Sequence, residues 1–128
     1  MVMASASLAR AAEIQPQTFA GSAAMSDLFE IQAAKIEVQN GRSEKIKAFV
    51  EDMIKDHGQS TEKLNAAAAK DGVALPAALD AGHQKKLDAL RALKGVKLDA
   101  AYASTQITMH FSAVALFGAY SKNGRAAR

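Results

Sequence analysis

The stretch EKIKAFVEDMIKDHGQSTEKLNAAAAK, from Glu44 to Lys70, decides the fold that we expect for this chain. Its apolar residues recur at spacings of three and four, which is the pattern of an amphipathic helix. These residues are Ile46, Phe49, Val50, Met53, Leu64 and Ala68. His57 falls on the same apolar stripe, so we expect its imidazole ring to point into the interior of the protein.

The composition favours an all-α protein of one domain. The chain has 128 residues, of which 49% are hydrophobic, and this is enough for a single packed core. Only 5% are aromatic and alanine is abundant, whereas a β-sandwich or barrel needs many β-branched and aromatic residues between frequent turns. No segment after the amino terminus approaches the ~20 consecutive apolar residues of a membrane-spanning helix, so we expect no membrane span.

The charges and the missing cysteines exclude several functions. The 16 basic and 13 acidic residues give a net charge of +3, but they alternate along the expected helices and form no basic stripe, so we expect no nucleic-acid partner. A chain without cysteine has no disulfide, thiolate zinc site or cysteine nucleophile. It also lacks a Gly-rich phosphate loop, G-x-S-x-G and H-E-x-x-H, which makes an enzyme the less favoured class.

The amino terminus is similar to the end of a secretory signal peptide. It is small and apolar, and Ala9-Arg10-Ala11 forms an A-x-A cleavage site ahead of Ala12. The charged leader that precedes such a site is missing, so a late-assigned start, a trimmed sequence and an ordinary chain terminus are alternatives. We expect an exported protein, periplasmic in a Gram-negative cell. The expected segments are a signal-peptide remnant (1–11), a linker (12–17), the helical bundle (18–122) and a tail (123–128).

A helical hairpin is the expected starting unit of the fold. Thr18 can cap a first helix over Phe19–Gln39, which a left-handed cap at Asn40-Gly41 would end. Ser43 can cap the central helix. Because so short a connection separates the two helices, they must run antiparallel.

Two further helices complete the expected bundle, and each carries a histidine on its apolar side. The third covers Ala77–Leu93, where His83 lies among leucines. The fourth covers Ala100–Tyr120, with Asp99 as its cap. Around His110, the same face of the fourth helix carries Ala103, Ile107, Val114 and Phe117. We therefore expect all three histidines to face the interior.

Four segments together resemble a known family. They are E-I-Q-A-A-K-I from Glu30, K-A-F-V-E-D-M-I-K-D-H ending at His57, L-D-A-A-Y from Leu98, and Met109-His110. Their order and spacing resemble the ferritin-like family called domain of unknown function 4142, over Phe19 to about Asn123. The resemblance implies an up-down bundle with two long antiparallel helices, a short third helix and a long fourth. It also implies an exported bacterial protein, of a kind often described as an outer-membrane protein, with no settled biochemical activity.

Members of that family usually continue into one more long helix that carries another inward histidine. The present sequence stops before that helix. We therefore expect the bundle to leave an apolar groove larger than the few hundred Å² that a monomer normally exposes. A homo-oligomer in which a second copy fills the groove is the expected result, unless the sequence is shortened relative to the natural protein.

The histidines and carboxylates define a candidate metal site. A ferritin-like di-iron centre needs a Glu-x-x-His motif on two helices, but isoleucines, Ile54 and Ile107, stand three residues before His57 and His110. A mononuclear site for zinc, copper, nickel or iron remains. Its candidate ligands are His57, His110, Glu30, Asp56 and His83.

Each candidate ligand also has a purely structural interpretation. Glu30 and Glu37 share one flank of the first helix, where they either reach a metal or remain in solvent. Each histidine can be a neutral core residue bonded to a hydroxyl or carboxylate across the bundle, for example to Tyr102, Thr105 or Tyr120. The favoured hypothesis is an exported binding or structural module with no catalytic or cofactor-binding residue. The alternative is a mononuclear metal-binding protein, with or without redox activity.

Overall fold

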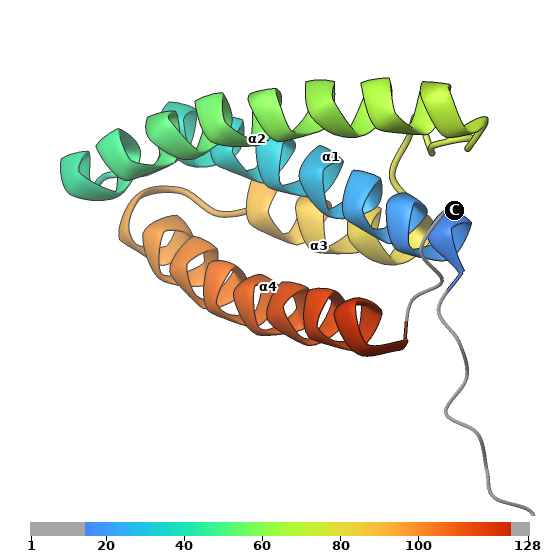
Figure 1. The fold of residues 1–128 in the computed structure, drawn as a ribbon. Helices are drawn as coiled ribbons and strands as arrows, with labels where there is room; N and C mark the ends of the chain where they lie inside the picture. Colours follow the sequence, from blue (N-terminus) through green and yellow to red (C-terminus); the bar gives the residue numbers. More distant parts are fainter. Residues whose placement is uncertain (1–14, 124–128) are drawn as a thin grey trace, which may run out of the picture.

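The computed structural model describes residues 15–123, which fold into four helices (Figure 1). In chain order these are α1 (Pro16–Asn40), α2 (Glu44–Asp71), α3 (Ala81–Arg91) and α4 (Gly95–Asn123). The described residues contain no strand, and the predicted all-α bundle is confirmed. None of the described helices is both long and apolar enough to cross a membrane. The predicted signal-peptide remnant lies outside the described residues.

The central helix is α1, where the sequence had indicated α2. Helices α2, α3 and α4 all pack against α1 (Figure 1). Small side chains make this possible, because Ala24, Ala33 and Ala34 are buried on α1 and let neighbouring backbones approach closely. As a result, α1 also buries three acidic residues, Asp27, Glu30 and Glu37.

Both ends of α1 differ from the prediction. The helix begins at Pro16, a residue type that suits the first helical position, so Thr18 lies inside the helix and does not cap it. Its carboxyl end also differs, because Gly41 has an extended backbone with φ −74° and ψ 167°. The left-handed cap predicted at this point is therefore wrong.

The predicted cap at the start of α2 is confirmed. The Ser43 hydroxyl accepts a hydrogen bond from the Ile46 N–H at 3.3 Å. Gly72 ends the helix in the left-handed conformation with φ 67°, which glycine adopts without steric cost. The stripe itself is only partly buried, because Val50 is fully buried whereas Phe49 remains 60% exposed. The predicted inward position of Phe49 is therefore wrong.

Helix α3 is shorter than expected, because Asp80 caps it. The Asp80 carboxylate accepts a hydrogen bond from the His83 N–H at 2.8 Å, so the helix begins at Ala81 and not at Ala77. Leu87 and Leu90 of α3 are buried in the core, as their spacing indicated.

Helix α4 begins at Gly95, so Asp99 lies within its first turns and does not cap it. Instead, the Asp99 carboxylate accepts hydrogen bonds from the N–H groups of Arg42 and Ser43, each at 3.0 Å. Asp99 thereby satisfies backbone donors at the start of α2. The first turns of α4 are thus fixed to the beginning of α2.

The buried face of α4 is not the face that contains His110. Leu98, Tyr102 and Met109 enter the core, whereas His110 is exposed. The predicted inward position of His110 is therefore wrong in this arrangement, because α4 rests on α1 through a neighbouring face. At the far end of α4, the ring of Tyr120 stacks on Phe19 of α1 with centroids 4.0 Å apart.

Candidate functional site

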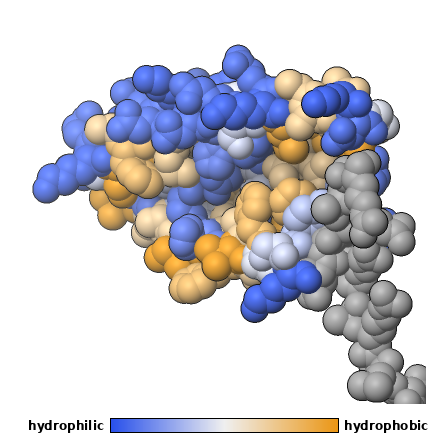
Figure 2. Space-filling view, viewed as in Figure 1, coloured by the Kyte–Doolittle hydropathy of each residue, from blue (hydrophilic) through white to orange (hydrophobic). Residues whose placement is uncertain are grey.

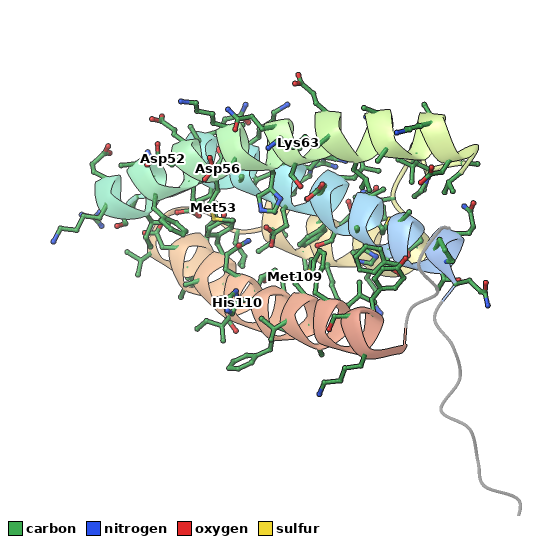
Figure 3. The ribbon with its side chains drawn as sticks, in the orientation of Figure 1. Asp52, Met53, Asp56, Lys63, Met109 and His110 are labelled. Atoms are coloured by element: carbon green, nitrogen blue, oxygen red, sulfur yellow. The ribbon has the colours of Figure 1, made fainter. Side chains whose placement is uncertain are left out.

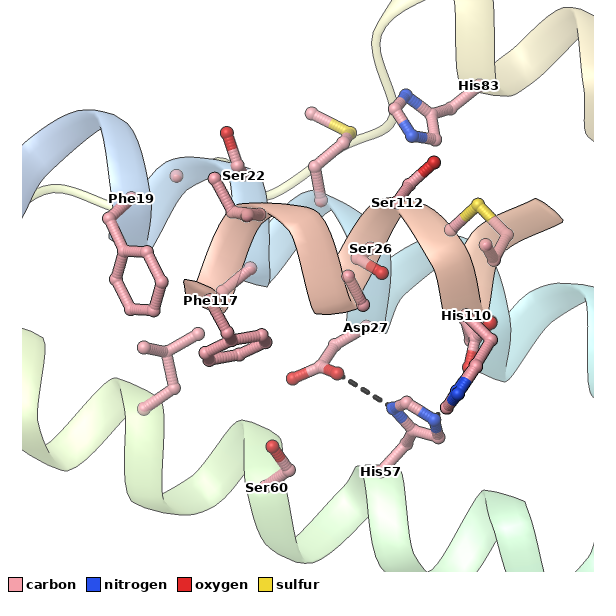
Figure 4. A pocket seen from close by; sticks show the side chains of 18 of the residues that line it. Phe19, Ser22, Ser26, Asp27, His57, Ser60, His83, His110, Ser112 and Phe117 are labelled. Carbon is pink, nitrogen blue, oxygen red and sulfur yellow. Dashed lines mark hydrogen bonds and ion pairs between the residues drawn. The ribbon is translucent and has the colours of Figure 1, made fainter. Parts of the chain in front are cut away.

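A long groove separates α2 from α4. Both helices pack on α1 and run in the same direction, but they hardly contact each other (Figure 1). The space between them is a groove of about 1520 Å³. Its floor includes Ser22 and Ser26 of α1, whose small side chains leave it deep. Its walls include Phe49, Met53 and Ser60 of α2 and Ile107, His110 and Phe117 of α4 (Figure 4).

An ion-paired histidine lies in this groove. The His57 ring of α2 reaches across to α1 and donates from Nδ1 to the Asp27 Oδ1 at 2.8 Å (Figure 4). On its other side, Nε2 donates to the Glu30 Oε2 at 2.6 Å. The Thr61 hydroxyl donates to the second Asp27 oxygen at 3.3 Å. One imidazole therefore joins two carboxylates that are one helical turn apart on α1.

These two carboxylates fix the charge of His57. The hydrogen bonds to Asp27 and then to Glu30 raise the pKa of His57 to about 10, against the opposing effect of burial. At neutral pH the ring is an imidazolium with both N–H groups engaged. It has no free lone pair for a metal ion or for proton abstraction. In this state the cluster is a partly buried ionic bond between α1 and α2.

A second polar cluster lies where the starts of α2 and α4 meet α1. The Glu37 carboxyl is fully buried, faces the Asp99 carboxylate and has no other hydrogen-bond partner among the described residues. Burial, and then the neighbouring Asp99, raise the pKa of Glu37 to about 7. The hydrogen bond with Glu37 lowers the pKa of Asp99. Both carboxyl groups stand so close to Gly41 that a Cβ there would collide with them.

The predicted metal ligands are only partly brought together. Glu30 and His57 are in contact, but His83 binds Asp80 at 2.8 Å through Nδ1. Asp56 is exposed on α2, and His110 is exposed on the α4 wall of the groove (Figure 3). Within residues 15–123 no group of three or more histidine, aspartate or glutamate side chains is arranged to hold a metal ion. All three histidines nevertheless line the same groove.

The family model described as "Domain of unknown function (DUF4142)" matches residues 2–128. The chain belongs to the DUF4142 family. No curated protein and no solved structure matches the chain. Membership in DUF4142 confirms the resemblance found in the sequence and assigns no biochemical activity, because the family itself is uncharacterised.

The sequence did not reveal the role of Asp27 or the pairing of Glu37 with Asp99 in this DUF4142 protein. Asp27 stands three residues before Glu30, so the two lie on one face of α1, and this spacing was the available signal. The pairing of Glu37 with Asp99 left no comparable signal, because the two residues are far apart in sequence and on different helices. The carboxylates that hold His57 also differ from the partners suggested for it, Tyr102, Thr105 and Tyr120.

Proposed function

We propose that this protein is an exported helical-bundle binding module whose groove between α2 and α4 accepts an amphipathic α-helix. The observation that carries this proposal is the groove itself, which has exposed aromatic residues on both walls. Phe49 of α2 is 60% exposed and Phe117 of α4 is 55% exposed. Exposed apolar residues on both walls of a cleft mark a binding surface.

The arrangement of the three long helices favours a helical ligand. Helices α1, α2 and α4 occupy three corners of a four-helix bundle, in which α1 packs against the other two. The fourth corner is the groove, and a helix placed there would touch α2 and α4 together. An extended chain or a small molecule would use less of a groove of about 1520 Å³, since most small-molecule pockets hold roughly 300–1,000 Å³.

A fluorescent label in the groove tests this proposal. The chain has no cysteine, so Ser60→Cys places a single environment-sensitive dye on the α2 wall. The probe is a synthetic amphipathic peptide of Leu, Ala and Lys, about 20 residues long to match the helices. We expect a saturable blue shift in emission, weakened by Phe117→Ala. A dye at Lys55→Cys, on the exposed opposite face of α2, should not respond.

A scrambled peptide of the same composition is the matched control. Its leucines are spread around the helix, so it presents no apolar face to the groove. If both peptides shift the dye equally, or if neither does, the groove is not a site for amphipathic helices.

Export is a separate part of the proposal and is supported by the sequence of residues 1–11. Expression of the gene with its own upstream sequence in a Gram-negative cell, followed by osmotic-shock fractionation, tests it. We expect the protein in the periplasmic fraction, with a mature chain that begins at Ala12. A full-length protein that stays in the cytoplasm would contradict the proposal.

Mononuclear metal binding is a second candidate, supported by the three histidines that line one groove. A metal at His57 would have to displace the proton that Asp27 and Glu30 stabilise there. Elemental analysis of the untagged protein after dialysis against zinc, copper, nickel or iron salts tests this candidate. Stoichiometric metal that is lost in both His57→Ala and His110→Ala supports it, whereas less than one ion per chain rejects it.

A further inference from the structure

The outer side of α4 carries a row of uncharged residues, which we call the α4 seam. Its central positions are Ile107, Phe111, Val114 and Gly118, spaced by four, three and four residues. Phe111 is 70% exposed, Ile107 61% and Val114 58%. This is the heptad spacing by which one helix packs along another. Ser104 and Ser121 continue the row at its two ends.

The seam differs in charge from the exposed side of α2. Between Asp99 and Lys122, α4 contains no Asp, Glu, Lys or Arg. The exposed side of α2 is rich in them and includes Asp52, Asp56 and Lys63 (Figure 3). Figure 2 shows hydrophilic residues over α2 and hydrophobic residues over α4. A helix that keeps one face in solvent normally carries charges there, so the seam has the character of a covered surface.

We propose that a second copy of this chain covers the α4 seam, with the two α4 helices antiparallel about a two-fold axis. The seam is self-complementary in this direction. An axis that passes between Phe111 and Val114 sets Phe111 of each copy against Val114 of the other, and Ile107 against Gly118. Large side chains thus meet smaller ones, and no charged side chain is buried.

The size of the seam sets the strength of the expected dimer. The three exposed fractions given above correspond to roughly 350 Å² of apolar surface in each copy. A standard interface buries roughly 800 Å² per partner, so this dimer should be weak and reversible. The seam borders the groove at Ile107 and Phe111, which also line the α4 wall, but the α2 wall and the floor of the groove take no part in the seam.

Sedimentation velocity over a concentration series tests the dimer. We expect wild-type protein to shift from one chain to two as its concentration rises to about 1 mM, the range of a weak interface. Phe111→Glu should raise the dissociation constant by about 100-fold or more, as loss of a central aromatic residue does. Phe49→Glu makes the same change at an exposed phenylalanine on the groove wall and should leave the dimer intact.

Cysteine cross-linking tests the antiparallel geometry, since the chain has no native cysteine. At 1.5 Å per residue, positions 115 of the two copies lie about 7 Å apart along the axis, and positions 104 about 26 Å apart. A short bis-maleimide should therefore link Ala115→Cys to itself. It should link Ser104→Cys to Ser121→Cys but not to itself, and it should not link Lys55→Cys.

Three results would overturn the proposal. A wild-type protein that remains monomeric throughout the concentration series rules out the dimer. Self-linking of Ser104→Cys indicates parallel helices and rules out the antiparallel seam. A dimer that Phe49→Glu abolishes and Phe111→Glu does not assigns the interface to the groove. Failure here leaves the groove proposal standing, because that proposal depends on the peptide response of the Ser60→Cys label.

Discussion

The ion-paired His57 predicts an unusual loss of stability in mildly alkaline solution. In the unfolded chain a histidine releases its proton near pH 6.5, whereas in the folded protein the pKa of His57 is about 10. Between these two values the folded state holds one more proton than the unfolded state. The free energy of unfolding is therefore highest below pH 6.5 and falls as the pH rises towards 10.

The size of this effect follows from the two pKa values. Each unit of pKa difference corresponds to about 1.4 kcal/mol, so the full rise from 6.5 to about 10 sets an upper limit of about 5 kcal/mol. The His57 side chain is 27% exposed, and solvent screening reduces this value. We expect the free energy of unfolding to fall by about 2 kcal/mol between pH 7 and pH 9.

Urea denaturation followed by circular dichroism at about pH 7, 8 and 9, at constant ionic strength, measures this slope. His57→Gln should be less stable at pH 7, because two buried carboxylates lose their cation. Over this range its stability should fall much less than that of the wild type, because only the remaining part of the Glu37 contribution is still lost above pH 7. His83→Gln is the matched control, because His83 pairs with the exposed Asp80 at the start of α3 and not with the carboxylates of α1, and it should keep the wild-type slope. A flat wild-type profile, or an equal slope in His57→Gln, would refute the reasoning.

Three further predictions concern the cluster at the starts of α2 and α4. Because the pKa of Glu37 rises from 4.5 to about 7, its contribution to the free energy of unfolding is complete below pH 4.5 and is lost as the pH rises through 7. Glu37→Gln should remove this pH dependence in urea titrations, and an unchanged dependence would contradict the prediction. Gly41→Ala should lower the free energy of unfolding by about 1–3 kcal/mol, because its methyl group meets two carboxyl groups. Gly58→Ala on α2, where space is open, should instead raise the free energy of unfolding by about 0.5–1 kcal/mol. Thermal unfolding of the two variants shows whether their changes in stability have these opposite signs. Asp99→Ala should speed hydrogen exchange of the Arg42 and Ser43 amides, which lose their acceptor, and unchanged protection would show that Asp99 does not cap α2.

Much of the fold could be predicted from the sequence, and less of the site. The four helices follow from the three-and-four spacing of apolar residues, and the caps at Ser43 and Gly72 depend on residues that are local to each helix end. Glu30 and His57 were recognised as candidates that could share a site. The other carboxylate that binds His57, that of Asp27, was missed, because its role depends on the rotation of α1 against α2.

What the sequence determined by itself was local: where each helix forms, that α1 and α2 turn back on one another, and that histidines lie on apolar stripes. The tertiary structure decided which of two adjacent faces each helix buries. Helix α1 became central because its alanines admit three neighbours, and this turned Glu37 inward while α4 came to rest with His110 outside. The spacing of apolar residues along a helix shows roughly which side of the helix is buried, but it does not distinguish between positions that are neighbours around the helix. The choice between such positions is made by packing between helices, which no single segment contains.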